Sequence, residues 1–137
     1  MNSEESGAAA VELALVLPLL LFMLFGLVQI VVLINTRTIL EHAAGEAVRT
    51  AVVNDDPGKA EQRALRVSAA APRGAGFIGG RPKVTLAREG DAVIAEVRAE
   101  VILLPFFRQV SLAAGGDGTL DLRVRARRRK EPYLGYR

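Results

Sequence analysis

The chain has 137 residues, 18 of them basic and 15 acidic, for a formal net charge of +3, and half of its residues are hydrophobic. Once a membrane helix is set aside, a chain of this length holds one small domain, which argues against a sizeable enzyme core. The absence of cysteine excludes disulfides, thiolate zinc sites, cysteine nucleophiles and a lipid-modified cysteine anchor.

The first seven residues, MNSEESG, form a short polar stretch that contains two glutamates and no Lys or Arg. A secretory signal carries its small-residue cleavage site after the apolar region. Here the small residues come before that region, at Gly7 to Ala10. Cleavage at this point would remove a polar leader and leave the whole apolar helix on the mature protein.

A long apolar run follows, in which Gln29 is the only hydrogen-bonding side chain between Leu13 and Ile34. As an α-helix this run is about 33 Å long, enough to cross a hydrocarbon core of about 30 Å. Its side chains favour insertion by about 5 to 10 kcal/mol. The sequence therefore predicts a transmembrane helix over residues 8–34, with Glu12 as a single carboxylate at its edge.

The pattern of Gly7, then AAAVE, then an unbroken apolar helix resembles the leader of type IV prepilins and pseudopilins. In these families a prepilin peptidase cuts after the glycine, and the fifth mature residue is glutamate. The resemblance implies a cut between Gly7 and Ala8, with Glu12 as that glutamate. Further similarity, over roughly the first 50 residues, is to the TadE/TadF-like pseudopilins of tight-adherence (Tad) pili. The residues that add it are Arg37, Ala43, Ala44, Glu46, Arg49 and Ala51.

Two criteria give opposite orientations of the helix in the membrane. Arg37 and Arg49 lie beyond the C-terminal end of the span, so the positive-inside rule alone would place the N-terminus outside. The resemblance implies a single-pass protein of the bacterial inner membrane with an extracytoplasmic C-terminal domain. We adopt the second orientation, because the leader must reach a peptidase site that faces the cytoplasm.

Three residues of the span are candidates for subunit assembly and helix packing. Glu12 has two interpretations: a side chain that reaches the headgroups from the helix end, or a carboxylate buried between packed subunits, where it meets the new α-amino group of Ala8. Gly26 offers a point of close helix packing, and Gln29 an interhelical hydrogen bond. Pro18 predicts a mild kink.

The helix is expected to continue in water over residues 35–53, because apolar residues recur there at helical spacing. Glu46 and Arg49 are three residues apart on its other face and predict an ion pair that stabilises the helix by about 0.2 to 0.5 kcal/mol. The single histidine, His42, has no partner for metal binding or for nucleophile activation. At the helix end, Asp56 and Pro57 predict the N-cap and first position of a short helix over 57–71.

The rest of the chain changes to a period of two. Strands are expected near 83–88, 92–103 and 119–127, with the first two forming a hairpin. We interpret Leu104 to Phe107 as a loop or single turn over the core edge, with a lipid or partner contact as the alternative. The glycines Gly74, Gly76 and Gly79 match a dinucleotide pattern but lack its strand and helix context, so we interpret them as a connector.

Basic side chains alternate along the last predicted strand and continue to Lys130. Paired with the preceding strand, they would face Glu96 and Glu100 across the sheet. Nucleic acid or anionic lipid is the alternative partner, but no aromatic residues are interleaved with this basic row and no binding-motif helix accompanies it. We therefore expect a solvated strand end and no nucleic-acid partner.

These observations predict a pilin-like α+β fold: a long transmembrane and amphipathic helix, a short second helix and a three-stranded antiparallel sheet. The expected organisation is a leader at 1–7, a transmembrane helix at 8–34 and an extracytoplasmic domain at 35–137. No cofactor, metal site or catalytic residue is expected, so the protein is not expected to be an enzyme.

By resemblance, the chain is a structural subunit, a minor pilin or pseudopilin of a Tad-type pilus and secretion machine that serves surface adhesion. The implied partners are a prepilin peptidase, other pilin and pseudopilin subunits, the inner-membrane pilus assembly platform and membrane lipid. The alternative is an uncleaved, membrane-anchored binding or regulatory module.

Overall fold

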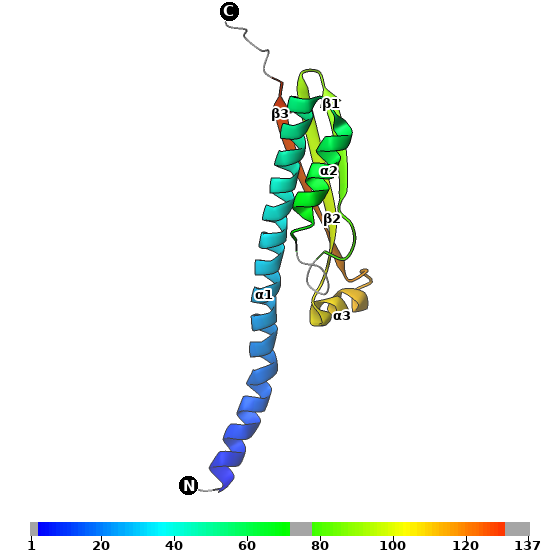
Figure 1. The fold of residues 1–137 in the computed structure, drawn as a ribbon. Helices are drawn as coiled ribbons and strands as arrows, with labels where there is room; N and C mark the ends of the chain where they lie inside the picture. Colours follow the sequence, from blue (N-terminus) through cyan, green and yellow to red (C-terminus); the bar gives the residue numbers. More distant parts are fainter. Residues whose placement is uncertain (1–2, 72–77, 131–137) are drawn as a thin grey trace, which may run out of the picture.

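A computed structural model describes residues 3–71 and 78–130, with side chains described from residue 7 onward. Of the features above, the first two leader residues and the glycines Gly74 and Gly76 lie outside the described residues. The elements, in chain order, are α1 (Ser3–Asn54), α2 (Pro57–Ser68), β1 (Lys83–Glu89), β2 (Ala92–Ile102), α3 (Pro105–Ala113) and β3 (Thr119–Arg129) (Figure 1). The α+β fold class is confirmed, with a long N-terminal helix, a short second helix and a three-stranded antiparallel sheet.

Helix α1 is continuous for 52 residues, with Pro18 inside it, which corresponds to a length of about 78 Å. Its N-terminal half extends alone, whereas its C-terminal half lies along the sheet (Figure 1). The chain reverses at Asp55, which has a positive φ of 53°. Asp56 then accepts hydrogen bonds from the backbone N–H groups of Gly58, at 2.9 Å, and Lys59, at 3.2 Å, which confirms the predicted N-cap of α2.

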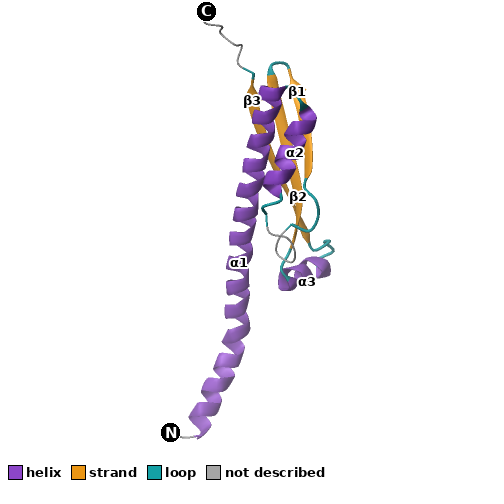
Figure 2. Cartoon of the chain, in the orientation of Figure 1, coloured by secondary structure: helices purple, strands orange, loops and turns teal. Residues whose placement is uncertain are grey.

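The sheet has the order β1-β2-β3, and both neighbouring pairs are antiparallel. Gly90, with a φ of 58°, lies in the tight turn between β1 and β2. Helices α1 and α2 cover one face of the sheet (Figure 2). The other face carries charged side chains, among them Glu96, Arg98 and Arg125. We call the C-terminal half of α1, α2, the sheet and α3 together the head. Its described part is a two-layer structure with a single core between the helices and the sheet.

The core is built largely from small side chains. On α1, the buried hydrophobic residues recur at helical spacing, and four of the six are alanines. Because alanine lets a helix backbone approach its neighbours closely, α1 and α2 lie tightly against the sheet. The buried hydrophobic residues of the cluster are Leu40, Ala43, Ala44, Ala47, Val48, Ala51, Ala60, Ala64, Ala71, Ile78, Val93, Ala95, Val97, Ala99 and Val124.

The segment after β2 differs from its predicted structure. A loop or single turn was expected from Leu104 to Phe107, but the structure has the nine-residue helix α3 there, with Pro105 in its first turn. Proline is well suited to that position because its missing N–H would have no partner in the first turn of a helix. None of the residues of α3 is fully buried, so this helix lies at the edge of the head and does not cover its core.

Candidate functional site

The most unusual surface of the molecule is the unaccompanied half of α1. Its large apolar side chains are exposed; Leu15 is 75% and Met23 70% exposed, whereas Leu40 in the packed half is fully buried. The helix is long and apolar enough to cross a membrane by length and composition, with a mean hydropathy of 2.8 in its most apolar window. This half of α1 is the candidate functional site, because water is an unfavourable environment for so much apolar surface.

The predicted cleavage point lies near the start of this surface, in a helical and exposed segment of α1. A side chain added at Gly7 would meet no atom within 4 Å, so packing within the chain does not require glycine there. Glu12 is also exposed, and it makes no ion pair within the described residues. Gly7 and Glu12 are thus not held by packing or ion pairs with the part of the chain that the structure describes.

The other two candidate residues of the span contact the chain's own head. The side-chain oxygen of Gln29 accepts a hydrogen bond of 2.9 Å from the backbone N–H of Leu104, just before α3. A side chain added at Gly26 would meet Phe107 of α3 at 3.5 Å. The sequence assigned Gly26 and Gln29 to packing between helices, and the structure brings a helix of the same chain to both.

Three phenylalanines connect α3 to the span. The ring of Phe22 lies 5.2 Å from that of Phe106 and 5.6 Å from that of Phe107, measured between centroids. Phe106 and Phe107 are themselves 5.6 Å apart in an edge-to-face arrangement, which is favoured for aromatic pairs. Sequence reasoning missed this cluster, because Phe22 looks like any other apolar residue of a membrane helix and its partners lie more than 80 positions away.

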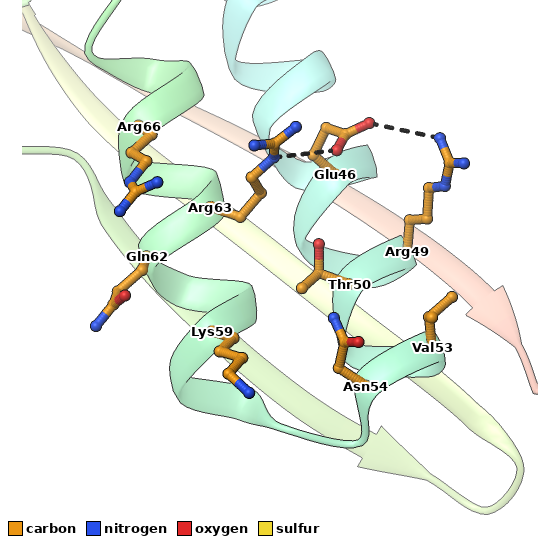
Figure 3. Close-up of a pocket in the computed structure, with 9 residues that line it drawn as sticks. All are labelled: Glu46, Arg49, Thr50, Val53, Asn54, Lys59, Gln62, Arg63 and Arg66. Carbon is orange, nitrogen blue, oxygen red and sulfur yellow. Dashed lines mark ion pairs between the residues drawn. The ribbon is translucent and has the colours of Figure 1, made fainter.

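A shallow hollow of about 520 Å³ lies between the end of α1 and α2 (Figure 3). Glu46 lies 4.0 Å from Arg49, the predicted helix ion pair, and 3.5 Å from Arg63 on α2. The carboxylate thus connects the two helices. The lining residues are Glu46, Arg49, Thr50, Val53, Asn54, Lys59, Gln62, Arg63 and Arg66. Its four basic residues make the hollow cationic, which is unfavourable for a metal ion.

The charged face of the sheet is organised around Glu96, whose side chain is 11% exposed. Arg123 and Arg125 of β3 lie 3.4 Å and 3.3 Å from it, and Arg98 of β2 also donates to it. The hydrogen bond from Arg98 is the main cause that lowers the pKa of Glu96 below its ordinary value of 4.5, and the positive charges of Arg98 and Arg123 and a hydrogen bond from Arg125 add to it. The predicted pairing of strand arginines with Glu96 is therefore present.

Glu100 differs from Glu96 in its neighbour on β3: the register places an acidic residue, Asp121, directly opposite Glu100, whereas Arg125 lies opposite Glu96. The described residues contain no group of three or more His, Asp or Glu side chains that could hold a metal ion. Taken together, the described side chains offer apolar contact, ion pairing and a hydrogen bond that joins the span to the start of α3.

Comparison with protein families gives a match for the N-terminal part of the chain. Residues 7–49 match the model of the TadE-like protein family, which confirms the resemblance and includes every predicted assembly residue. The match covers 43 of the 137 residues and lies entirely on α1, and the family is one of structural proteins associated with the Tad pilus. No curated protein and no solved structure matches the chain.

Replacing Gln29 by leucine should loosen α3. The substitution removes the acceptor of the Leu104 N–H, and a partly buried donor left without a partner is destabilising by about 1 to 3 kcal/mol. Hydrogen exchange of the detergent-solubilised protein, measured by mass spectrometry, should become faster at Leu104 and through α3. Gln109→Leu, at an exposed position of α3, is the control and should leave exchange at Leu104 unchanged. Unchanged exchange in Gln29→Leu would contradict the role of this hydrogen bond.

The Glu96 cluster should make the stability of the head depend on pH. Because the folded-state pKa of Glu96 is lowered, its contribution is fully present above the unfolded-state pKa and is lost as the pH falls through the folded-state pKa. The thermal midpoint of the native protein should therefore fall between about pH 5 and pH 3, and Glu96→Gln should reduce that fall. Glu100→Gln is the control. Glu100 lies opposite Asp121 and outside the Glu96 cluster, so this variant should keep the fall in thermal midpoint. An equal fall in native protein and Glu96→Gln would exclude this source of pH dependence.

Proposed function

We propose that this chain is a minor pilin or pseudopilin of a Tad-type pilus and secretion machine, processed by a prepilin peptidase between Gly7 and Ala8. Residues 8–34 anchor it as a single-pass protein of the bacterial inner membrane, and the α+β head lies on the extracytoplasmic side. The family match over residues 7–49 supports this proposal. The observation that carries it is the continuity of the exposed apolar half of α1 with the half that packs in the head.

This continuity suits a subunit that assembles through its helix. One unbroken helix enters the core of the head, so a force or contact on the apolar half is transmitted to the head without a flexible linker. The prepilin peptidase, the other pilin and pseudopilin subunits and the assembly platform of the inner membrane are the partners that this role requires. The uncleaved, membrane-anchored binding module is the second candidate, and cleavage separates the two.

Glu12 has a specific place in this proposal. After cleavage it is the fifth residue, and its carboxylate meets the new α-amino group of Ala8 on its own or a neighbouring chain when helices pack. A carboxylate buried without a cation is strongly destabilising, so this pair would fix the axial position of one subunit against the next. The exposure of Glu12 and the lack of an ion pair within the described residues leave it available for such a contact.

Cleavage is tested by the mass of the N-terminal peptide of the protein extracted from membranes of its native host. The native chain should begin at Ala8, and Gly7→Leu should retain the leader. Gly45→Leu is a matched control, because Gly45 also lies in α1 and a side chain there would meet no atom within 4 Å. This variant should be cut normally. A native chain that begins at Met1 would support the uncleaved module and exclude the pilin proposal.

The role of Glu12 is tested separately from cleavage. Glu12→Gln should still begin at Ala8 but should be lost from the sheared pilus fraction and from complexes with other pilins, as measured by immunoblotting against equal amounts in the membrane. Glu61→Gln on α2 is the control, since Glu61 is exposed and lies outside the span. Normal assembly of Glu12→Gln would show that the carboxylate stays at the headgroups and has no pairing role.

A further inference from the structure

Helix α3 has two chemically different sides. Its polar side faces the head: the Ser111 hydroxyl accepts a hydrogen bond of 3.3 Å from the N–H of Gly118. The stem of Arg108 lies so close to Gly118 that a side chain added there would meet it at 2.6 Å. These contacts fix the rotation of α3 about its own axis against the segment that leads into β3.

The other side of α3 is apolar and lacks a complete partner. Phe106 and Val110 are four residues apart, so they lie on the same face of the helix. They are 47% and 53% exposed, and no residue of α3 is fully buried. The described part of the head therefore leaves this face uncovered, and the face is available for contact with something beyond it.

The apolar face of α3 is continuous with the apolar surface of α1. Phe106 contacts Phe22 edge to face, and Phe22 belongs to the span whose neighbouring side chain Met23 is 70% exposed. The surroundings of α1 at Phe22 and Met23, whether lipid or water, therefore also contact the exposed part of Phe106. Figure 1 shows α3 at the base of the head, to one side of α1 and roughly crosswise to it.

The position of α3 along α1 corresponds to a membrane boundary. The segment from Ala8 to Gly26 has 19 residues and a helical length of about 28 Å, close to the hydrocarbon thickness of about 30 Å. If Ala8 starts at the inner boundary of the hydrocarbon core, then α3, which contacts Phe22 and Gly26, lies near the outer boundary. The end of the 8–34 span then lies in the outer headgroup region, because the core and headgroup regions together are about 40 to 45 Å thick. A helix with one polar and one apolar face is suited to this interface, with the apolar face about 5 to 10 Å inside it.

We propose that α3 is a second membrane contact, which lies in the outer-leaflet interface with Phe106 and Val110 among the phospholipid acyl chains. This inference rests on the proposed insertion of α1. Together, the span and α3 hold the head at a fixed height and tilt on the membrane, because the Phe22 cluster and the Gln29 hydrogen bond join them at the interface. A single helix would leave that tilt unconstrained.

Because the native chain has no cysteine, single-cysteine variants of the full chain can test depth directly. Val110→Cys reports on α3, Leu20→Cys on the span, and Val53→Cys is the matched control. Val53 is an exposed helical valine like Val110, but it lies at the far end of α1. Ala113→Cys, on the same side of α3 as Val110, is a second reporter in case Val110→Cys disturbs the fold.

Each variant is labelled with an environment-sensitive fluorophore and reconstituted in phosphatidylcholine and phosphatidylglycerol vesicles, with fewer than one copy per vesicle. Phospholipids that are spin-labelled at a shallow or a deep acyl position serve as quenchers. The label at position 110 should show blue-shifted emission and be quenched more by the shallow spin label. The label at Leu20 should be quenched more by the deep one, and the label at Val53 should resemble a label in water.

Every other outcome excludes the proposal, and the outcomes are distinguishable. If the labels on α3 behave like the label at Val53 while Leu20 is quenched, the span inserts but α3 does not touch lipid. If the labels on α3 become shielded only at high protein density, and without lipid quenching, a second copy of the chain covers this face. If the label at Leu20 is also in water, the membrane insertion in the proposed function is itself wrong.

Discussion

The packing of the second half of α1 against the sheet is the contact on which the rest of the molecule depends. The same helix provides both the apolar span and one layer of the head core, so the head cannot form without fixing the direction of the span. Small residues such as Ala43, Ala44 and Ala47 make this possible, because their side chains let the helix lie close to the strands. The head and the membrane helix consequently move as one body in the described part of the chain.

The sequence predicted the elements that depend on local patterns. Spacing of apolar residues gave the long helix and the three strands, and Asp56 gave the start of α2, because these signals lie within a few residues of each other. Helix α3 was missed, because its bulky residues Phe106 and Phe107 resemble a loop cover and its polar residues are too few for a clear pattern. Its stability depends on contacts with Phe22 and with Gly118, which no local pattern contains.

The candidate site, like the fold, was predictable only where its signals lie close together in the sequence. Gly7, Ala8 and Glu12 could be identified as candidates from a compact motif, and the partners proposed for them lie outside this chain. Gln29 could be recognised as a polar residue in an apolar span, but its hydrogen-bond partner could not, because Leu104 is 75 positions away and donates from its backbone. Likewise, the sequence predicted pairing of Glu96 with the arginines of β3, and the three-dimensional register decided which of them reach it.

The order of the strands affects how the sheets of neighbouring copies of the chain could contact each other. Within residues 3–71 and 78–130, β1 and β3 each pair on one side only, so both edges of the sheet carry backbone groups that another strand could bind. Arginines at positions 123, 125 and 127 of β3 lie along one of these edges. Two copies that met there would bring like charges together, and charged edges resist the joining of sheets. Where many heads lie close together in one plane, the charges along β3 would therefore oppose pairing of that edge with a second sheet.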